Sequence, residues 1–317
     1  MPALYGIEEK YFNGYKVDKE NDSVVYSDEQ HVYLDKEDCQ KYISVTQLIH
    51  AYSNEFDSEF WSAYKALESI LDQDTWFGIK GTLLSRKKFD RKLLTKLNVE
   101  DSVFDEKQKE ILAEYDRKRE ESCIRGTEIH RGFEESFYGK NRFNFRQFGF
   151  DEIGDYDFTC KKDYFKLDLS RGVYPEFLIS CKSEDGILRL SGQIDCLIID
   201  ENDVYILDFK TNKEIKKSGY FDKVKKQKQT LKFPLNELDD CNFNIYQLQL
   251  SVYAYMLQTL KPELNIKKLM LYHIDHDGNE TLHECQYLKK DVIRMLNHYK
   301  KQLKIQQELN KNKPIKM

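Results

Sequence analysis

The sequence predicts an α/β protein in which a central mixed β-sheet is flanked by helices, with an N-terminal α+β module. Short apolar runs separated by turn residues recur between about 173 and 274, which is typical of strands. Longer segments carry apolar residues at helical spacing, and the apolar fraction of 40 % is sufficient for a folded core. We expect the N-terminal module to span residues 1–100 and the sheet-containing domain, with a C-terminal helix and a basic tail, to span 101–317.

Composition and charge exclude several classes of protein. The chain has 50 basic and 55 acidic residues, and its net charge of −5 excludes a uniformly basic protein that coats nucleic acid, although it is compatible with a local basic channel. The first residues lack the pattern of a secretory signal, and no apolar run is long enough to span a membrane. Seven scattered cysteines without a Cys-x-x-Cys pair favour reduced thiols. We therefore expect a soluble, intracellular protein.

The N-terminal hundred residues are predicted to contain a hairpin followed by helices. Two β-prone runs, 24–26 and 31–34, lie on either side of a polar turn. Ser44 and Gln47 form the pattern of a capping box, which marks a helix start, and 57–75 continues as helix. The region 78–100 is rich in lysine and arginine, which fits either a solvated helix face or a contact with a nucleic-acid strand.

The rest of the chain alternates predicted helices and strands. Two of the strands are adjacent in the sequence and are joined by a polar turn at 201–203, so we expect them to form an antiparallel hairpin. We expect helices at 105–138, 243–260 and 289–309, and strands at 177–180, 193–200, 204–210 and 269–274, with 186–192 leading into the second of these strands.

Two acids and a lysine on the predicted hairpin carry the chemical signal. Asp195 lies near the start of one strand, Asp208 near the end of the next, and Lys210 two residues later. Because side chains alternate along a strand, Asp208 and Lys210 point to the same face. Two carboxylates close together repel each other unless a cation lies between them, and a hard divalent cation such as Mg²⁺ prefers oxygen ligands. An exposed Asp–Lys pair on an edge strand is the alternative, but the apolar run 204–207 argues for burial.

Four short motifs follow one another in order between about 120 and 275. They are Gly126-x-x-x-His130, Gly192-x-x-Asp195, Asp208-Phe209-Lys210-Thr211 and Gln249-x-x-x-Tyr253. In this order they resemble the PD-(D/E)XK nuclease superfamily, in its RecB-like exonuclease branch, and the segments 234–240 and 246–253 are similar to phage and viral members of that branch.

The resemblance implies a restriction-endonuclease-like core and a role for each matching residue. His130, Asp195, Asp208 and the Phe209 backbone carbonyl would bind one or two Mg²⁺ or Mn²⁺ ions, and Lys210 would be the catalytic lysine. Glu176 stands where relatives place an additional catalytic acid. Gln249 and Tyr253 would contact DNA or orient Lys210, and Gly126 would allow a close approach to the helix of His130.

Considered by themselves, these supporting residues also fit ordinary structural roles. His130 is compatible with a half-buried helical histidine, and Gln249 and Tyr253 with one face of an amphipathic helix. Glu134, on the face of His130, fits either a supporting acid or a solvent-exposed one. Lysines 213, 216 and 217 begin a basic stretch, 213–232, that fits the rim of a nucleic-acid path or a solvated loop. Aromatic residues within it could stack on unpaired bases.

The expected function is a metal-dependent DNA exonuclease acting on duplex ends or single strands in viral or phage replication, recombination or repair. The chain lacks the cysteine triplet of an iron–sulfur cluster and the Walker A pattern of an ATPase, so we expect no such cluster and expect any helicase or recombination protein to be a separate partner. The alternatives are a catalytically silent DNA-binding or scaffold subunit and an RNA-cleaving nuclease.

Overall fold

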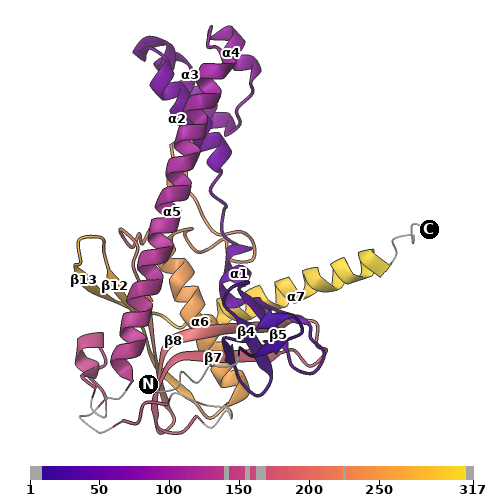
Figure 1. Cartoon of the computed structure of the whole chain (residues 1–317), viewed down its shortest axis with the longest axis vertical. Helices are drawn as coiled ribbons and strands as arrows, with labels where there is room; N and C mark the ends of the chain where they lie inside the picture. Colours follow the sequence, from indigo (N-terminus) through magenta and orange to yellow (C-terminus); the bar gives the residue numbers. More distant parts are fainter. Residues whose placement is uncertain (1–8, 139–142, 154–157, 162–168, 224–225, 312–317) are drawn as a thin grey trace, which may run out of the picture. The chain divides into compact units, whose positions relative to one another are not determined.

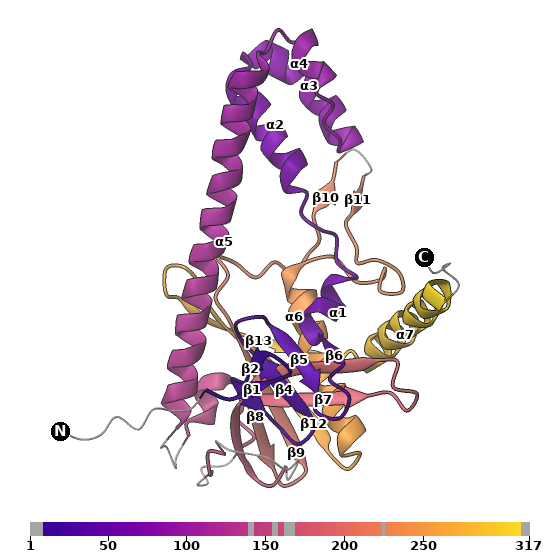
Figure 2. The ribbon, with the colours of Figure 1, turned by 45° about the vertical axis from the view of Figure 1, so that its right-hand side comes forward.

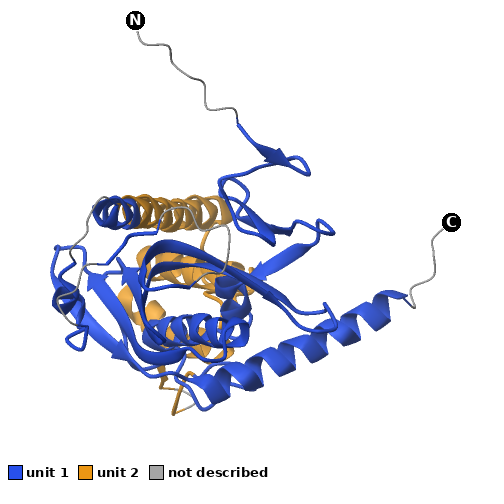
Figure 3. Ribbon diagram, turned by 90° about the horizontal axis from the view of Figure 1, so that it is seen from below, with its two compact units in different colours: residues 1–53, 129–219, 230–317 blue, residues 54–128, 220–229 orange. Residues whose placement is uncertain are grey.

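The computed structural model describes residues 9–138, 143–153, 158–161, 169–223 and 226–311, and these form two compact units. Figure 3 shows unit 1, built from Met1–Ser53, Ile129–Gly219 and Thr230–Met317, and unit 2, built from Asn54–Glu128 and Tyr220–Gln229. The basic tail expected at the C-terminus lies at 312–317, outside the described residues.

Unit 1 contains a nine-stranded mixed sheet (Figure 1). The sheet has the order β13-β12-β9-β8-β6-β5-β4-β3, and β7 also pairs with β8. The pairs β9–β12 and β6–β8 are parallel and the others are antiparallel, so the predicted mixed α/β fold is confirmed. The strands are β3 (Lys19–Glu20), β4 (Val24–Ser27), β5 (Val32–Asp35), β6 (Lys41–Ser44), β7 (Gly172–Lys182), β8 (Arg189–Asp200), β9 (Asp203–Lys210), β12 (Asn265–Ile274) and β13 (Glu280–Cys285).

Two apolar clusters cover opposite faces of this sheet because side chains alternate along each strand. On one face, Ile206 and Leu271 pack in a cluster with helices α1 (Val45–His50), α6 (Asn242–Leu260) and α7 (Lys289–Lys311). On the other face, Leu207 and Phe209 pack with Phe137 at the end of helix α5 (Asp101–Phe137) and with the short 3₁₀ helix η1 (Phe145–Phe148). The capping box predicted at Ser44 and Gln47 is present at the start of α1.

Unit 2 is a small helical unit with its own apolar cluster. It contains α2 (Ser58–Ile70), α3 (Gln73–Arg86), α4 (Lys92–Lys96), most of α5 and the short strands β10 (Phe221–Asp222) and β11 (Gln227–Lys228), all labelled in Figure 2. The single helix expected at 57–75 is two helices, because Leu71 is extended and the Asp72 side chain accepts a hydrogen bond from Thr75 N–H and caps α3.

The boundary expected at residue 100 lies inside unit 2 and does not coincide with the division between the two units. The reason is that β6 and α1 share the core of strands β8 and β9: β6 pairs with β8, and Val45, Leu48 and Ile49 are buried in the same cluster as Ile206. Within the described residues, no helix is both long enough and apolar enough to cross a membrane.

Candidate active site

The hairpin of β8 and β9 brings Asp195 and Asp208 side by side. The antiparallel register ends at Cys196↔Leu207, so the next two residues, Asp195 and Asp208, face each other across the strands. The Phe209 N–H donates a hydrogen bond to Asp195 Oδ2 at 2.8 Å, which fixes that carboxylate at the end of the ladder. Both acids lie on the sheet face covered by α6.

Glu176 joins them from β7, through an unusual backbone conformation. The pairs Pro175↔Cys196 and Phe177↔Ile194 flank Glu176 and Asp195, which places the two acids opposite each other. Glu176 has φ 48°, in the left-handed region that non-glycine residues rarely adopt. Such a conformation costs about 1–3 kcal/mol and tends to occur at functional sites, where the surrounding structure enforces it. Here two long runs of strand pairing enforce it.

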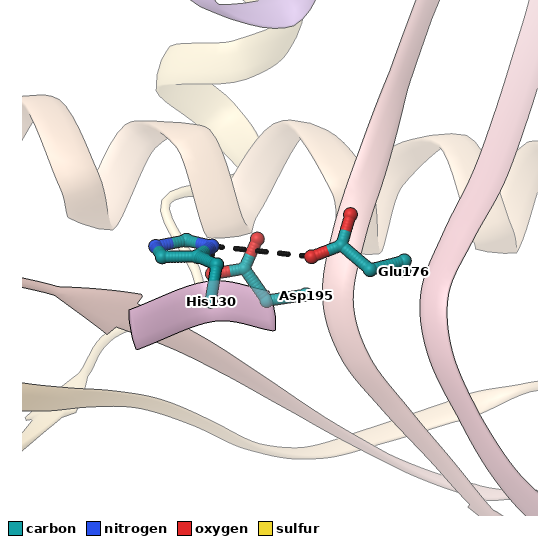
Figure 4. Close-up of side chains that lie close together, drawn as sticks. All are labelled: His130, Glu176 and Asp195. Carbon is teal, nitrogen blue, oxygen red and sulfur yellow. Dashed lines mark ion pairs between the residues drawn. The ribbon is translucent and has the colours of Figure 1, made fainter. Parts of the chain in front are cut away.

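His130 reaches the same acids from α5 (Figure 4). Its Nδ1 lies 3.5 Å from Asp195 Oδ2 and 3.9 Å from Glu176 Oε1. Its Nε2 lies 3.0 Å from the Phe209 carbonyl oxygen. A carbonyl can only accept, so Nε2 carries the hydrogen, and in the neutral ring Nδ1 offers a lone pair toward the two acids. The Phe209 carbonyl, expected from the sequence to face a cation, is therefore engaged by His130 in this structure.

Lys210 and Gln249 complete the cluster on the side of Asp208. Lys210 Nζ lies 2.7 Å from Asp208 Oδ2 and 3.4 Å from Gln249 Oε1, and Gln249 Nε2 lies 3.3 Å from Asp208 Oδ1. Lys210 Nζ also lies 4.6 Å from the centre of the Tyr246 ring, a cation–π contact. Gln249 and Tyr246 lie on the same face of α6, and each contacts the Lys210 ammonium group.

Burial and mutual charge shift the protonation of these groups. Burial, and then the Asp208 charge, raise the pKa of Asp195 to about 7. Burial alone would lower the pKa of His130, but Asp195 and Glu176 outweigh it and raise the pKa to about 9. Burial likewise opposes the charge of Lys210, but Asp208 and Asp195 outweigh it and hold the pKa of Lys210 above its usual range. The resting lysine is therefore an ammonium ion at neutral pH.

A model of the PD-(D/E)XK nuclease superfamily matches residues 66–314 of the chain. The chain belongs to this superfamily. Matching solved structures include that of SSO0001, which is 14 % identical, has a TM-score of 0.32, and aligns over 83 % of this chain and 76 % of its own. Another is a protein of Eubacterium rectale named provisionally as an exonuclease, which is 11 % identical, has a TM-score of 0.30, and aligns over 83 % and 79 % of the two chains. A comparison with curated proteins gave no match.

Membership of the PD-(D/E)XK superfamily implies hydrolysis of phosphodiester bonds, for which its nucleases typically use divalent metal ions. The residues present fit such an ion. His130, Glu176 and Asp195 each offer a ligand atom, and these atoms lie within 4.8 Å of one another. Asp208 Oδ2 is buried and has an ion pair with Lys210 but no hydrogen bond within the described structure. A set rich in carboxylate oxygens suits Mg²⁺ or Mn²⁺, and the imidazole is better suited to Mn²⁺.

The other residues predicted from the PD-(D/E)XK motifs lie on α6, β8 and α5. Tyr253 is buried on α6, one helical turn after Gln249. A Cβ added at Gly192 would come within 2.9 Å of the Tyr253 ring, so the glycine permits β8 and α6 to approach closely. Gly126 lies on α5, one turn before His130, and is half-buried.

The three lysines expected to bind nucleic acid are exposed in the segment after β9. Lys216 forms an ion pair with Glu214 at 3.0 Å, and Lys217 Nζ lies 5.1 Å from the centre of the Phe243 ring. The structure thus places Lys213, Lys216 and Lys217 on the surface, separate from the contacts that join the acids and His130.

Sequence reasoning missed two residues of the cluster. Tyr246 could have been found, because it lies one helical turn before Gln249 on the same face of α6. Lys19 could not: its Nζ lies 3.4 Å from Glu176 Oε2, but the two residues are 157 positions apart and no local pattern links them.

Proposed function

We propose that this PD-(D/E)XK protein is a divalent-metal-dependent deoxyribonuclease, and that its centre is formed by five side chains. The observation that carries the proposal is their convergence. Ligand atoms of His130, Glu176 and Asp195 lie within 4.8 Å of one another, Asp208 forms an ion pair with Lys210, and the register of β8 and β9 places Asp208 beside Asp195. A buried arrangement of this kind is unfavourable for folding alone, because like charges repel and charged groups lose hydration.

Glu176, Asp195, Asp208 and His130 would hold the cation, which when bound supplies positive charge to the scissile phosphate and to the attacking water. The Phe209 carbonyl, a further ligand in the motif-based expectation, would need to exchange its contact with His130 for the cation. The protein's own contribution is to fix these groups: the register of β7, β8 and β9 sets the three acids, and in the metal-free protein the bond to Phe209 orients the His130 ring.

Lys210 would act as a fixed cation toward the substrate. Because its pKa is held above the usual range, it is protonated and can donate a hydrogen bond to a phosphate oxygen as negative charge develops there. Gln249 and Tyr246 would keep its Nζ beside Asp208 instead of in solvent. Tyr253 would support Gln249 from the next turn of α6.

The finer assignment rests on the order of the four motifs. It favours the RecB-like branch and an exonuclease that trims DNA ends or single strands, in phage or viral replication, recombination or repair. In this proposal the exposed Lys213, Lys216 and Lys217 contact the DNA backbone, the N-terminal residues contribute to the wall of the DNA channel, and a separate helicase or recombination protein supplies the substrate.

The test is degradation of radiolabelled DNA and RNA by the pure protein, with and without Mg²⁺ or Mn²⁺. We expect DNA cleavage that requires the metal and that falls at least about 100-fold in Asp208→Ala and Lys210→Ala proteins. Binding of DNA without cleavage would favour a scaffold subunit, and preferential loss of RNA would favour a ribonuclease. Full activity in either variant would show that the chemistry takes place elsewhere.

A further inference from the structure

Lys19 lies outside all four motifs, yet its ammonium group belongs to the same charged cluster. Lys19 Nζ lies 3.4 Å from Glu176 Oε2 and 4.0 Å from Glu134 Oε1. Its side chain is 34 % exposed, whereas that of Glu176 is 17 % exposed. Lys19 is therefore the more exposed member of this ion pair.

The position of Lys19 is fixed by hydrogen bonds between the β3–β4 turn and strand β7. Asn21 Nδ2 donates to the Leu178 carbonyl oxygen at 3.2 Å, and Asn21 Oδ1 accepts from Val24 N–H at 2.8 Å. Ser23 Oγ lies 3.3 Å from Ser180 Oγ. Because Leu178 is two residues beyond Glu176 on β7, these bonds hold the turn, and with it Lys19, against the strand that carries the acid.

The acid next to Lys19 in the sequence is paired with other lysines. Glu20 Oε2 lies 2.7 Å from Lys36 Nζ, and Glu20 Oε1 forms an ion pair with Lys10. Lys19 therefore contacts Glu176 of the cluster and, at the longer distance of 4.0 Å, Glu134, so a change in the state of Glu176 acts directly on Lys19.

A divalent cation at the proposed centre would compete with Lys19 for Glu176, because both neutralise the same carboxylate. Once Glu176 turns to the cation, the Lys19 ammonium loses that partner while it stays half-exposed beside the centre. A phosphate group of the substrate is the anion that must then come close. Resting on the function proposed above, we propose that Lys19 has two partners in turn, Glu176 in the metal-free protein and a nucleic-acid phosphate in the metal-bound protein.

The first experiment measures metal binding by titration calorimetry with Mn²⁺ in the absence of nucleic acid. Lys19→Ala removes the competing cation, so it binds Mn²⁺ about two- to fivefold more tightly than the wild type, the range expected for a partly exposed ion pair. Lys36→Ala is the matched control: it removes one positive charge from the same N-terminal segment, away from Glu176, and leaves the affinity for Mn²⁺ unchanged.

The second experiment measures binding of a fluorescein-labelled, single-stranded oligonucleotide with hydrolysis-resistant phosphorothioate linkages, at saturating Mn²⁺ and increasing NaCl. Lys19→Ala binds it more weakly, and the slope of log K against log [NaCl] is smaller by about 0.7, the value for one lost phosphate contact. Lys19→Arg restores both the affinity and the slope, whereas Lys36→Ala keeps the wild-type slope.

Two results overturn the proposal for Lys19. One is that Lys19→Ala binds Mn²⁺ with the same affinity as the wild type, or binds the oligonucleotide with the same dependence on NaCl concentration. The other is weaker Mn²⁺ binding together with a lower melting temperature, which assigns Lys19 a purely structural role. The wild-type protein distinguishes this result from failure of the proposed function. If the wild type cleaves DNA and Lys19→Ala matches it in Mn²⁺ affinity and salt slope, only the role of Lys19 is refuted. If the wild type neither binds Mn²⁺ nor cleaves DNA, the proposed function is refuted as well.

Discussion

In the proposed centre, the protonation of Asp195 would control the binding of a cation. Burial, reinforced by Asp208, raises the pKa of Asp195 to about 7, so near neutral pH this acid is divided between its neutral and charged forms. A metal ligand must be deprotonated, and the same holds for Nδ1 of His130, whose pKa is raised to about 9. Binding of a cation therefore displaces protons.

This gives a pH dependence with a definite sign. In the metal-free protein both groups bind protons more tightly than in a model peptide, so the apparent affinity for Mn²⁺ rises as the pH is raised from about 6 to 8. Titration calorimetry at about pH 6.5, in two buffers of different ionisation enthalpy, should show release of about one to two protons per ion bound. The Asp195→Asn protein should release fewer protons per Mn²⁺ ion bound. A binding enthalpy that is the same in both buffers would contradict the assignment.

Gln249 links the acid and the lysine of the Asp-x-Lys motif, with one contact to Asp208 and one to Lys210. Gln249→Ala removes both contacts, and because misplacement of a catalytic group is costly, we expect cleavage to slow by about 10- to 100-fold. Steady-state cleavage of an end-labelled oligonucleotide measures this. Gln258→Ala, the same substitution near the far end of α6, is the control. Equal cleavage rates in Gln249→Ala and Gln258→Ala would show that Gln249 has no role in positioning Asp208 and Lys210.

At the level of single residues, the sequence was sufficient to predict that residues on two adjacent strands of a hairpin lie close together. Asp195, Asp208 and Lys210 could be placed because a short turn joins their strands and fixes the register. Glu176, His130 and Gln249 needed the family resemblance, since their partners are far along the chain. Lys19 was beyond reach, because a two-residue strand with mixed polarity gives no sign of which acid it will meet.

At the level of elements, a buried acid joins β5 to the strands of the centre. Asp35 is fully buried, and its Oδ2 lies 2.8 Å from Arg189 Nη1 on β8 and 3.0 Å from Lys182 Nζ on β7. The Tyr42 hydroxyl donates to the same oxygen at 2.9 Å. The network therefore ties four strands, β5, β6, β7 and β8, together at the end of the sheet where β6 pairs with β8.

Removing this acid should destabilise the protein. Asp35→Ala leaves the Lys182 and Arg189 charges without their buried partner, and we expect the free energy of unfolding to fall by about 3–5 kcal/mol. Urea unfolding followed by circular dichroism measures the change. Asp38→Ala is the control: Asp38 also pairs with Arg189, at 2.7 Å, but it is exposed, so its loss should cost at most about 1 kcal/mol. A similar small effect for both variants would show that the Asp35 network does not hold the strands.

The elements that the sequence did not predict have weak local signals. β6 is four residues long, and β13 exposes most of its side chains, so neither shows a clear apolar period. The two become strands because β8 and β12 offer them unpaired backbone groups. Conversely, the hairpins β4–β5 and β8–β9 were predicted correctly, since each is two β-prone runs on either side of a polar turn.

At the level of the whole molecule, the first 53 residues form one compact unit with the strands of the centre. A truncated chain without residues 1–53 would lose β3 to β6, the buried side of α1 and Lys19. We expect it to show no cooperative thermal unfolding and no cleavage, because the sheet loses the partner of β8 and the main cluster loses Val45, Leu48 and Ile49. A truncated protein that unfolds cooperatively and cleaves at the wild-type rate would contradict this.

The division of the chain could not be predicted from the sequence because it is not a single cut. Unit 2 is assembled from two separate segments, 54–128 and 220–229, and α5 runs from one unit into the other. The amino-acid composition does not change at the positions where the chain passes from one unit to the other. A single boundary near residue 100 was therefore the simplest expectation, and this residue lies inside unit 2.

The central claim is that His130, Glu176, Asp195 and Asp208 hold one shared divalent cation beside Lys210. The most direct measurement is the anomalous difference density of a crystal of the full chain soaked in Mn²⁺. We expect a peak bounded by these side chains, and we expect it to be lost in an Asp195→Asn crystal soaked in the same way. A crystal saturated with Mn²⁺ that shows no peak there, or a peak unaffected by Asp195→Asn, would contradict it.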